Sequence, residues 1–148
     1  MSQKLSKQQI EERQIAEEKF KGNNDLLFGK QADLVKAEQE VFDFLVSELS
    51  ELDILNNLDL ELLKICSNSV VELRKARINV RKYGQLIQKP DGSLQKNPAI
   101  GVTKDYESIF ARCCRELALS PSSRANLARL TAEASANSED ELLKILSE

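Results

Sequence analysis

The chain has 148 residues, of which 41% are apolar and 30% charged, and its net charge is −3. This composition fits one soluble, helix-rich domain with or without arms. It contains no histidine and three cysteines without a C-x-x-C spacing, which excludes histidine-dependent catalysis and argues against a disulfide framework or a structural zinc site. The sequence has no apolar run near the roughly 18 residues of a membrane span and no signal-peptide pattern, so we expect a cytoplasmic protein without membrane contact.

The charges are segregated along the chain. Residues 31–58 carry seven acidic and one basic side chain, and residues 131–148 carry five acidic and one basic. Residues 59–97, in contrast, carry eight basic and four acidic side chains. A moderately basic centre permits contact with nucleic acid but does not require it.

The first elements in chain order are a polar segment and two long helices. Residues 1–24 predict a polar arm or a frayed helix. A helix begins near Lys30, and its apolar face is formed by Leu34, Ala37, Val41, Phe44, Leu45 and Leu52. A second long helix is expected from about Leu58 to Tyr83, with Gly84 at its C-terminal cap. The short connection predicts that these two helices pack as an antiparallel pair.

Turn and cap signals follow. Pro90-Asp91-Gly92 predicts a tight turn in a small hairpin or extended loop. Asn97-Pro98 and Ser120-Pro121 each place a capping side chain before a proline that suits the first helical turn, so a third and a fourth helix begin there. After about Leu130 the sequence predicts a loosened linker and a last short helix capped by Ser138 and Glu141.

These signals predict an all-α fold. It consists of a long antiparallel helical hairpin, then a small turn or hairpin, then two further helices. The expected domains are the arm at 1–24, a helical core at 25–130, and a linker with a short C-terminal helix at 131–148.

The order of the motifs resembles the small subunit of phage terminases. The motifs lie within residues 31–130 and are Tyr83-Gly84, Asp91-Gly92, Asn97-Pro98, Glu116–Leu119, Ser120–Arg124 and Leu127. The resemblance implies a subunit without catalytic activity or cofactor that acts in the host cytoplasm. It implies that the subunit recognises double-stranded viral DNA for packaging, assembles as a homo-oligomeric ring, and delivers the DNA to the large terminase subunit.

The chain departs from this family pattern at two places. Ala118 stands where the family usually has glycine, and a left-handed alanine costs about 1–2 kcal/mol. Either the third helix ends differently here or the chain is strained at this residue. The N-terminal arm is nearly neutral instead of basic, which weakens the case that it binds DNA alone.

Cations on the second helix are the candidate DNA contacts. Lys64, Lys75 and Lys82 lie on one stripe, and Val71 and Ile78 on the same side are expected to touch a neighbouring subunit. The alternative is a solvated lysine face with two stray apolar residues. We add Arg74, Arg81 and Arg124 to the expected DNA contacts, although ordinary helix capping also explains the surroundings of Arg124.

Other residues have a structural or partner-binding interpretation. Arg77 points towards the apolar face and is expected to pair with an acidic side chain across helices, and the cysteines are expected to pack in the core. No metal site is predicted. The C-terminal apolar residues predict a docking segment for a partner or a packing element, and they are Leu142, Leu143, Ile145 and Leu146.

Two other functions remain open from the sequence. A helical adaptor would bind proteins through the acidic segments and would not bind DNA. A small helix-turn-helix regulator would be a dimer on a palindromic site.

Overall fold

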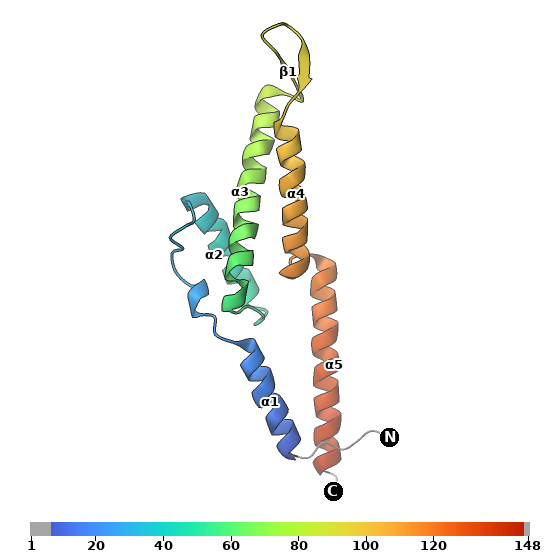
Figure 1. The fold of residues 1–148 in the computed structure, drawn as a ribbon. Coiled ribbons are helices and arrows are strands. Elements are labelled where there is room, and N and C mark those ends of the chain that lie inside the picture. The colour runs from blue at the N-terminus through green and yellow to red at the C-terminus, as the bar shows by residue number, and fades with distance from the viewer. Residues whose placement is uncertain (1–6, 147–148) are drawn as a thin grey trace. The chain divides into compact units, whose positions relative to one another are not determined.

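The computed structural model describes the backbone of residues 7–146, and their side chains except at positions 13, 17, 20, 137–142 and 144–146. The fold is mostly α-helical, as predicted (Figure 1). The elements are α1 (Lys7–Lys21), the 3-10 helix η1 (Asp25–Leu27), α2 (Lys36–Ser50), the 3-10 helix η2 (Asn57–Asp59), α3 (Leu60–Tyr83), β1 (Leu86–Gln88), β2 (Leu94–Lys96), α4 (Ala99–Glu116) and α5 (Pro121–Leu146).

The chain divides into two compact units. One is continuous and runs from Asn23 to Leu117, and the other combines residues 7–22 with residues 118–146. The helix that begins at Pro121 belongs to the second unit.

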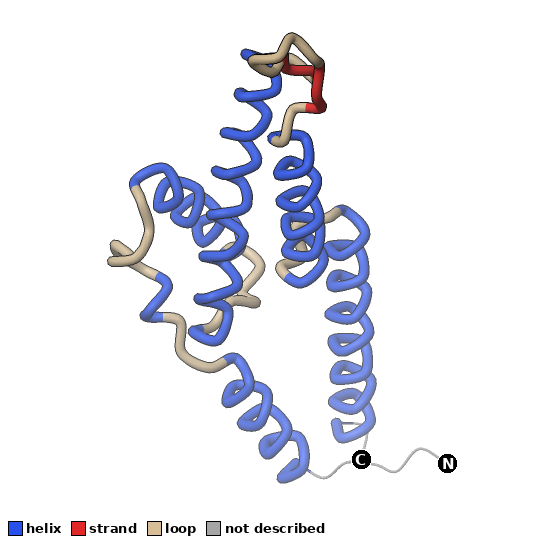
Figure 2. The backbone as a smooth tube through the Cα atoms, turned by 45° about the horizontal axis from the view of Figure 1, so that its top comes forward, coloured by secondary structure: helices blue, strands red, loops and turns tan. Residues whose placement is uncertain are grey.

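In the continuous unit, α3 packs against both α2 and α4 (Figures 1 and 2). The helix α4 runs back along α3, and the two are joined by the small β-hairpin. The core contains Leu27, Val41, Phe42, Leu45, Val46, Leu49, Leu55, Leu63, Cys66, Val71, Leu73, Ala76, Cys113 and Leu117. Helix α4 is therefore the antiparallel partner that lies along α3, and α2 adds a second packing layer on α3.

Two predicted positions are corrected by this packing. Phe44 is exposed and Phe42 is fully buried, because the stripe that α2 buries runs through Val41, Phe42, Leu45 and Leu49. Val71 is buried and so is not available as a contact for a second subunit. A helix packed on two sides buries more than one stripe, whereas the sequence argument assumed a single apolar face for α3.

The hairpin and the helix caps match their sequence signals. The strands pair antiparallel with Ile87 opposite Gln95, and Asp91 Oδ1 accepts the backbone N–H of Ser93 in the turn. Gly84 ends α3 with φ +85°, and its N–H donates to the carbonyl of Val80. Asn97 and Ser120 cap α4 and α5 by accepting backbone N–H groups of the first turns.

The C-terminal part differs from the prediction. Helix α5 is continuous from Pro121 to Leu146, so residues 131–138 are helical and not a linker, and no new helix begins after Ser138. The segment lacks glycine and proline and contains three alanines, which favours helix. Thr131 and Ser135 donate their hydroxyl hydrogens to the carbonyls of Leu127 and Thr131, one turn earlier in the same helix.

Ala118 adopts the left-handed conformation with φ +55°. We predict that Ala118→Gly raises the free energy of unfolding by about 1 kcal/mol. Glycine has no Cβ that clashes in the left-handed conformation, and this gain exceeds the loss from the greater entropy of glycine in the unfolded chain. Chemical denaturation measures this change. Ala111→Gly, on the exposed side of α4, is the matched control and is expected to lower stability by about 1 kcal/mol. Equal losses in both variants would contradict the assignment of strain to Ala118.

The buried thiol of Cys66 predicts a loss of stability in alkali. Burial, and then the neighbouring Cys113, raise its pKa from 9.0 to about 12. The unfolded chain releases this proton first, so the stabilising effect of the protonated thiol is complete below pH 9 and declines as pH rises towards 12. Between pH 8 and pH 10 the free energy of unfolding is expected to fall by about 1 kcal/mol more in the wild type than in Cys66→Ala. Parallel pH profiles of the two proteins in denaturant titrations would contradict this.

Candidate nucleic-acid interface

Positive charge concentrates where α3 ends, the hairpin turns and α4 begins. Residues 74–104 carry eight basic and one acidic side chain, in a chain whose net charge is −3. Antiparallel packing brings the last turns of α3 beside the first turns of α4. Cations that lie far apart in the sequence therefore share one end of the continuous unit.

An open groove of about 580 Å³ lies at this end of the unit. Its lining residues are Arg77, Val80, Arg81, Gln85, Lys96, Ile100, Thr103 and Lys104. Four cations thus surround two aliphatic side chains. The cations suit phosphate oxygens, and Val80 and Ile100 suit the carbon face of a sugar. We call this set of residues the basic groove.

One cation of the basic groove is partly neutralised. Arg77 Nη2 lies 3.1 Å from Glu107 Oε1 on α4, and both side chains are half-exposed. The predicted pairing of Arg77 with an acidic side chain across helices is confirmed, and its partner lies on α4. An exposed pair of this kind contributes little to stability. Within the described residues, Arg81, Lys96 and Lys104 make no ion pair.

A buried asparagine beside the basic groove fixes the end of α3 relative to the start of α4. Asn97 Nδ2 donates to the carbonyl of Gly84 at 2.9 Å and to Asn79 Oδ1 at 3.1 Å, and Asn97 Oδ1 accepts from the N–H of Ala99 at 2.9 Å. These bonds connect the end of α3 to the start of α4. The side chains that line the groove are therefore held on a closed hairpin.

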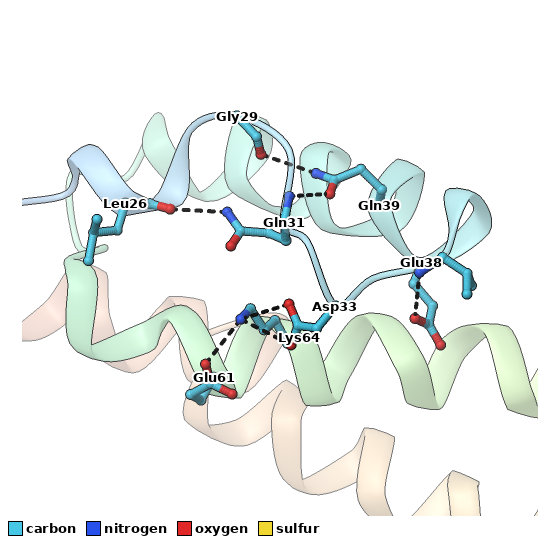
Figure 3. A network of polar contacts seen from close by, with 9 residues as sticks. Leu26, Gly29, Gln31, Asp33, Glu38, Gln39, Glu61 and Lys64 are labelled. Atoms are coloured by element: carbon cyan, nitrogen blue, oxygen red, sulfur yellow. Dashed lines mark hydrogen bonds and ion pairs between the residues drawn. The ribbon is translucent and has the colours of Figure 1, made fainter.

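Lys64 does not belong to this basic surface. Its Nζ lies 3.1 Å from both Asp33 and Glu61, and its side chain is only 14% exposed (Figure 3). The hydrogen bonds to Asp33 and then Glu61 raise the pKa of the ammonium group, and the bond from Lys64 lowers the pKa of Asp33. Lys64 anchors the segment before α2 to α3, and two carboxylates already neutralise its charge.

Further hydrogen bonds hold the segment before α2 in place. The side-chain amide of Gln31 donates to the carbonyl of Leu26, and that of Gln39 donates to the carbonyl of Gly29 (Figure 3). Gln39 Oε1 also accepts the backbone N–H of Gln31. The buried carboxylate of Glu38 accepts the N–H of Val35 and the amide of Asn68 on α3. The sequence stripe of lysines could not distinguish this structural lysine from a solvent-exposed one.

The remaining predicted cations on α3 surround Ile78. Arg74, Lys75, Arg81 and Lys82 are exposed at three- and four-residue spacing from it. Lys75 pairs with Glu72 at 2.6 Å, and Lys82 Nζ lies 5.0 Å from the centre of the Tyr83 ring. Arg81 also lines the basic groove, whereas Arg74 and Lys82 make no ion pair with any described residue.

Arg124 and the C-terminal apolar residues lie in the second unit. Arg124 Nη1 donates to the carbonyl of Leu119 at 2.6 Å, and Ser120 Oγ caps α5, which matches the capping interpretation. Leu143 is 64% exposed. The side chains of Leu142, Ile145 and Leu146 lie outside the described residues.

Lys96 and Lys104 were missed by the sequence argument. Lys96 follows the turn on β2 and Lys104 lies on α4, so neither belongs to the helical stripe that was considered. The charge count of residues 74–104 is the signal that would have included them.

The described residues contain no cluster of histidine, cysteine and acidic side chains that could hold a metal ion. Burial raises the pKa of each of the three cysteine thiols, which disfavours the reactive thiolate. None of the helices in the described range is long and apolar enough to cross a membrane.

A family model for the small subunit of phage terminase matches residues 39–134, about two thirds of the chain. This range contains α3, the hairpin and α4 entirely, and with them the basic groove. Comparison with curated proteins and with solved structures finds no match. The match over most of the length shows that the chain belongs to the phage terminase small subunit family.

Proposed function

We propose that this chain, whose family acts in phage DNA packaging in the infected host cell, is the non-catalytic subunit that recognises viral double-stranded DNA. It assembles into a ring in the host cytoplasm and delivers the DNA to the large terminase subunit. The observation that carries the proposal is the basic groove with its four cations.

Phosphate binding is the function that this groove supports best. Arg81, Lys96 and Lys104 are the groove cations without an ion pair among the described residues, so their charge is available to a polyanion. Each phosphate contact releases counterions, which makes the affinity fall with salt. Several copies of a weak site in one assembly bind DNA together far more tightly than one copy. A net charge of −3 for the whole chain is therefore compatible with DNA binding.

The C-terminal end of α5 is the proposed docking segment for the large subunit. Leu143 is exposed there, in a sequence in which the acidic run of residues 139–141 is followed by the apolar residues Leu142, Leu143, Ile145 and Leu146. An amphipathic helix of this kind suits an apolar groove on a partner.

Reversal of two groove charges tests the DNA contact. Lys96→Glu/Lys104→Glu is expected to weaken binding of duplex DNA by about tenfold or more, and to reduce the slope of log affinity against log salt by about two units per bound subunit. Fluorescence anisotropy over a range of salt concentrations measures both quantities.

Lys64→Gln is the matched control, because Asp33 and Glu61 already neutralise that lysine. Its DNA affinity is expected to stay within about twofold of the wild type. Wild-type affinity in the groove variant, or binding that does not respond to salt, would contradict the groove as the phosphate site. A complete absence of DNA binding in the wild type would favour the helical adaptor.

A further inference from the structure

Two exposed apolar side chains in the continuous unit have oppositely charged surroundings. Phe44 on α2 is 62% exposed, and Ile78 on α3 is 61% exposed. Single exposed apolar residues are ordinary on protein surfaces. The charges around these two residues are of opposite sign.

Phe44 has an acidic surround. Glu40 and Glu48 lie one turn before and one turn after it, and Asp43 precedes it in the chain; all three are exposed. The described residues include no cation paired with Glu40 or Glu48. We call Glu40, Asp43, Phe44 and Glu48 the Phe44 patch.

Ile78 has a basic surround. Arg74, Lys75, Arg81 and Lys82 lie three or four residues before or after it, which places all four around it on the helix surface. Only Lys75 is paired with an acidic side chain, Glu72, among the described residues. We call these four cations together with Ile78 the Ile78 patch.

We infer that the Phe44 patch of one copy docks on the Ile78 patch of a second copy. The apolar side chains would exclude water at the centre of the contact, and the opposite charges around them would set its orientation. Both patches are exposed in the same chain, so they do not cover each other within it. This inference rests on the assembly in the proposed function and names the two surfaces that would form it.

The geometry of such a contact favours a ring or a filament over a dimer. When only one Phe44 patch and one Ile78 patch meet between two copies, the contact is heterologous, and each added copy leaves one free patch of each kind. Assembly stops only when the last free patches meet and the ring closes. The contact also assigns Arg74, Lys75 and Lys82 to a neighbouring subunit instead of DNA.

Complementary charge reversal tests the inference on the full chain. Native mass spectrometry at low ionic strength should show multi-copy assemblies for the wild type. Glu40→Lys/Glu48→Lys and Arg74→Glu/Lys82→Glu should each remain single-copy. The changed Phe44 patch then has a net charge of +1, and the changed Ile78 patch, with Lys75 neutralised by Glu72, has a net charge of −1, so each meets a partner patch of its own sign. An equimolar mixture of the two variants, and a chain carrying all four changes, should both assemble again.

The groove variant Lys96→Glu/Lys104→Glu is the control, since neither residue belongs to a patch. Its assembly should equal that of the wild type while its DNA binding weakens by about tenfold or more, so the two proposals fail separately. The inference is overturned if the wild type is single-copy, if either reversal variant assembles at wild-type strength, or if the mixture fails to assemble. Should a reversal variant fail to fold by circular dichroism, Phe44→Ser and Ile78→Ser replace it, and wild-type assembly in either overturns the contact.

Discussion

The buried side chain of Asn97 is the interaction on which the basic groove depends. It is 3% exposed, and it connects the carbonyl of Gly84, the amide of Asn79 and the N–H of Ala99. The groove holds four cations close together, and their mutual repulsion opposes the closed hairpin. Hydrogen bonds of a buried amide resist this repulsion without charge of their own, and Glu107 offsets part of it at Arg77.

Charge segregation along the chain also affects the surface of the continuous unit. The cations of residues 74–104 make no ion pair with the acidic side chains of α2 among the described residues. The acidic side chains that pair with cations of α3 hold Lys64, Lys75 and Arg77, whereas Glu40, Asp43 and Glu48 on α2 remain exposed. A chain with separated charges of this kind is suited to intermolecular contacts, both with a polyanion and with further copies.

Local signals in the sequence predicted the features that local physics determines. Gly84, Asn97 and Ser120 end or begin helices as expected, because backbone chirality and unpaired N–H groups act within a few residues. The burial of Val71 and the exposure of Phe44 depend on where α2 and α4 pack on α3, which no periodicity within one helix contains. The basic groove was missed for the same reason, since α3, β2 and α4 each contribute part of its lining.

Arg81 connects the two proposed surfaces, because it lines the basic groove and also borders Ile78. In the proposed assembly, acidic side chains of a neighbour near Arg81 would lower the positive potential at that edge of the groove. Lys96 and Lys104, on the hairpin and α4, lie outside the Ile78 patch and would keep their charge. Each subunit would then hold DNA weakly, and tight binding would require the whole assembly. Weak individual contacts let DNA shift between subunits, as delivery to another protein requires.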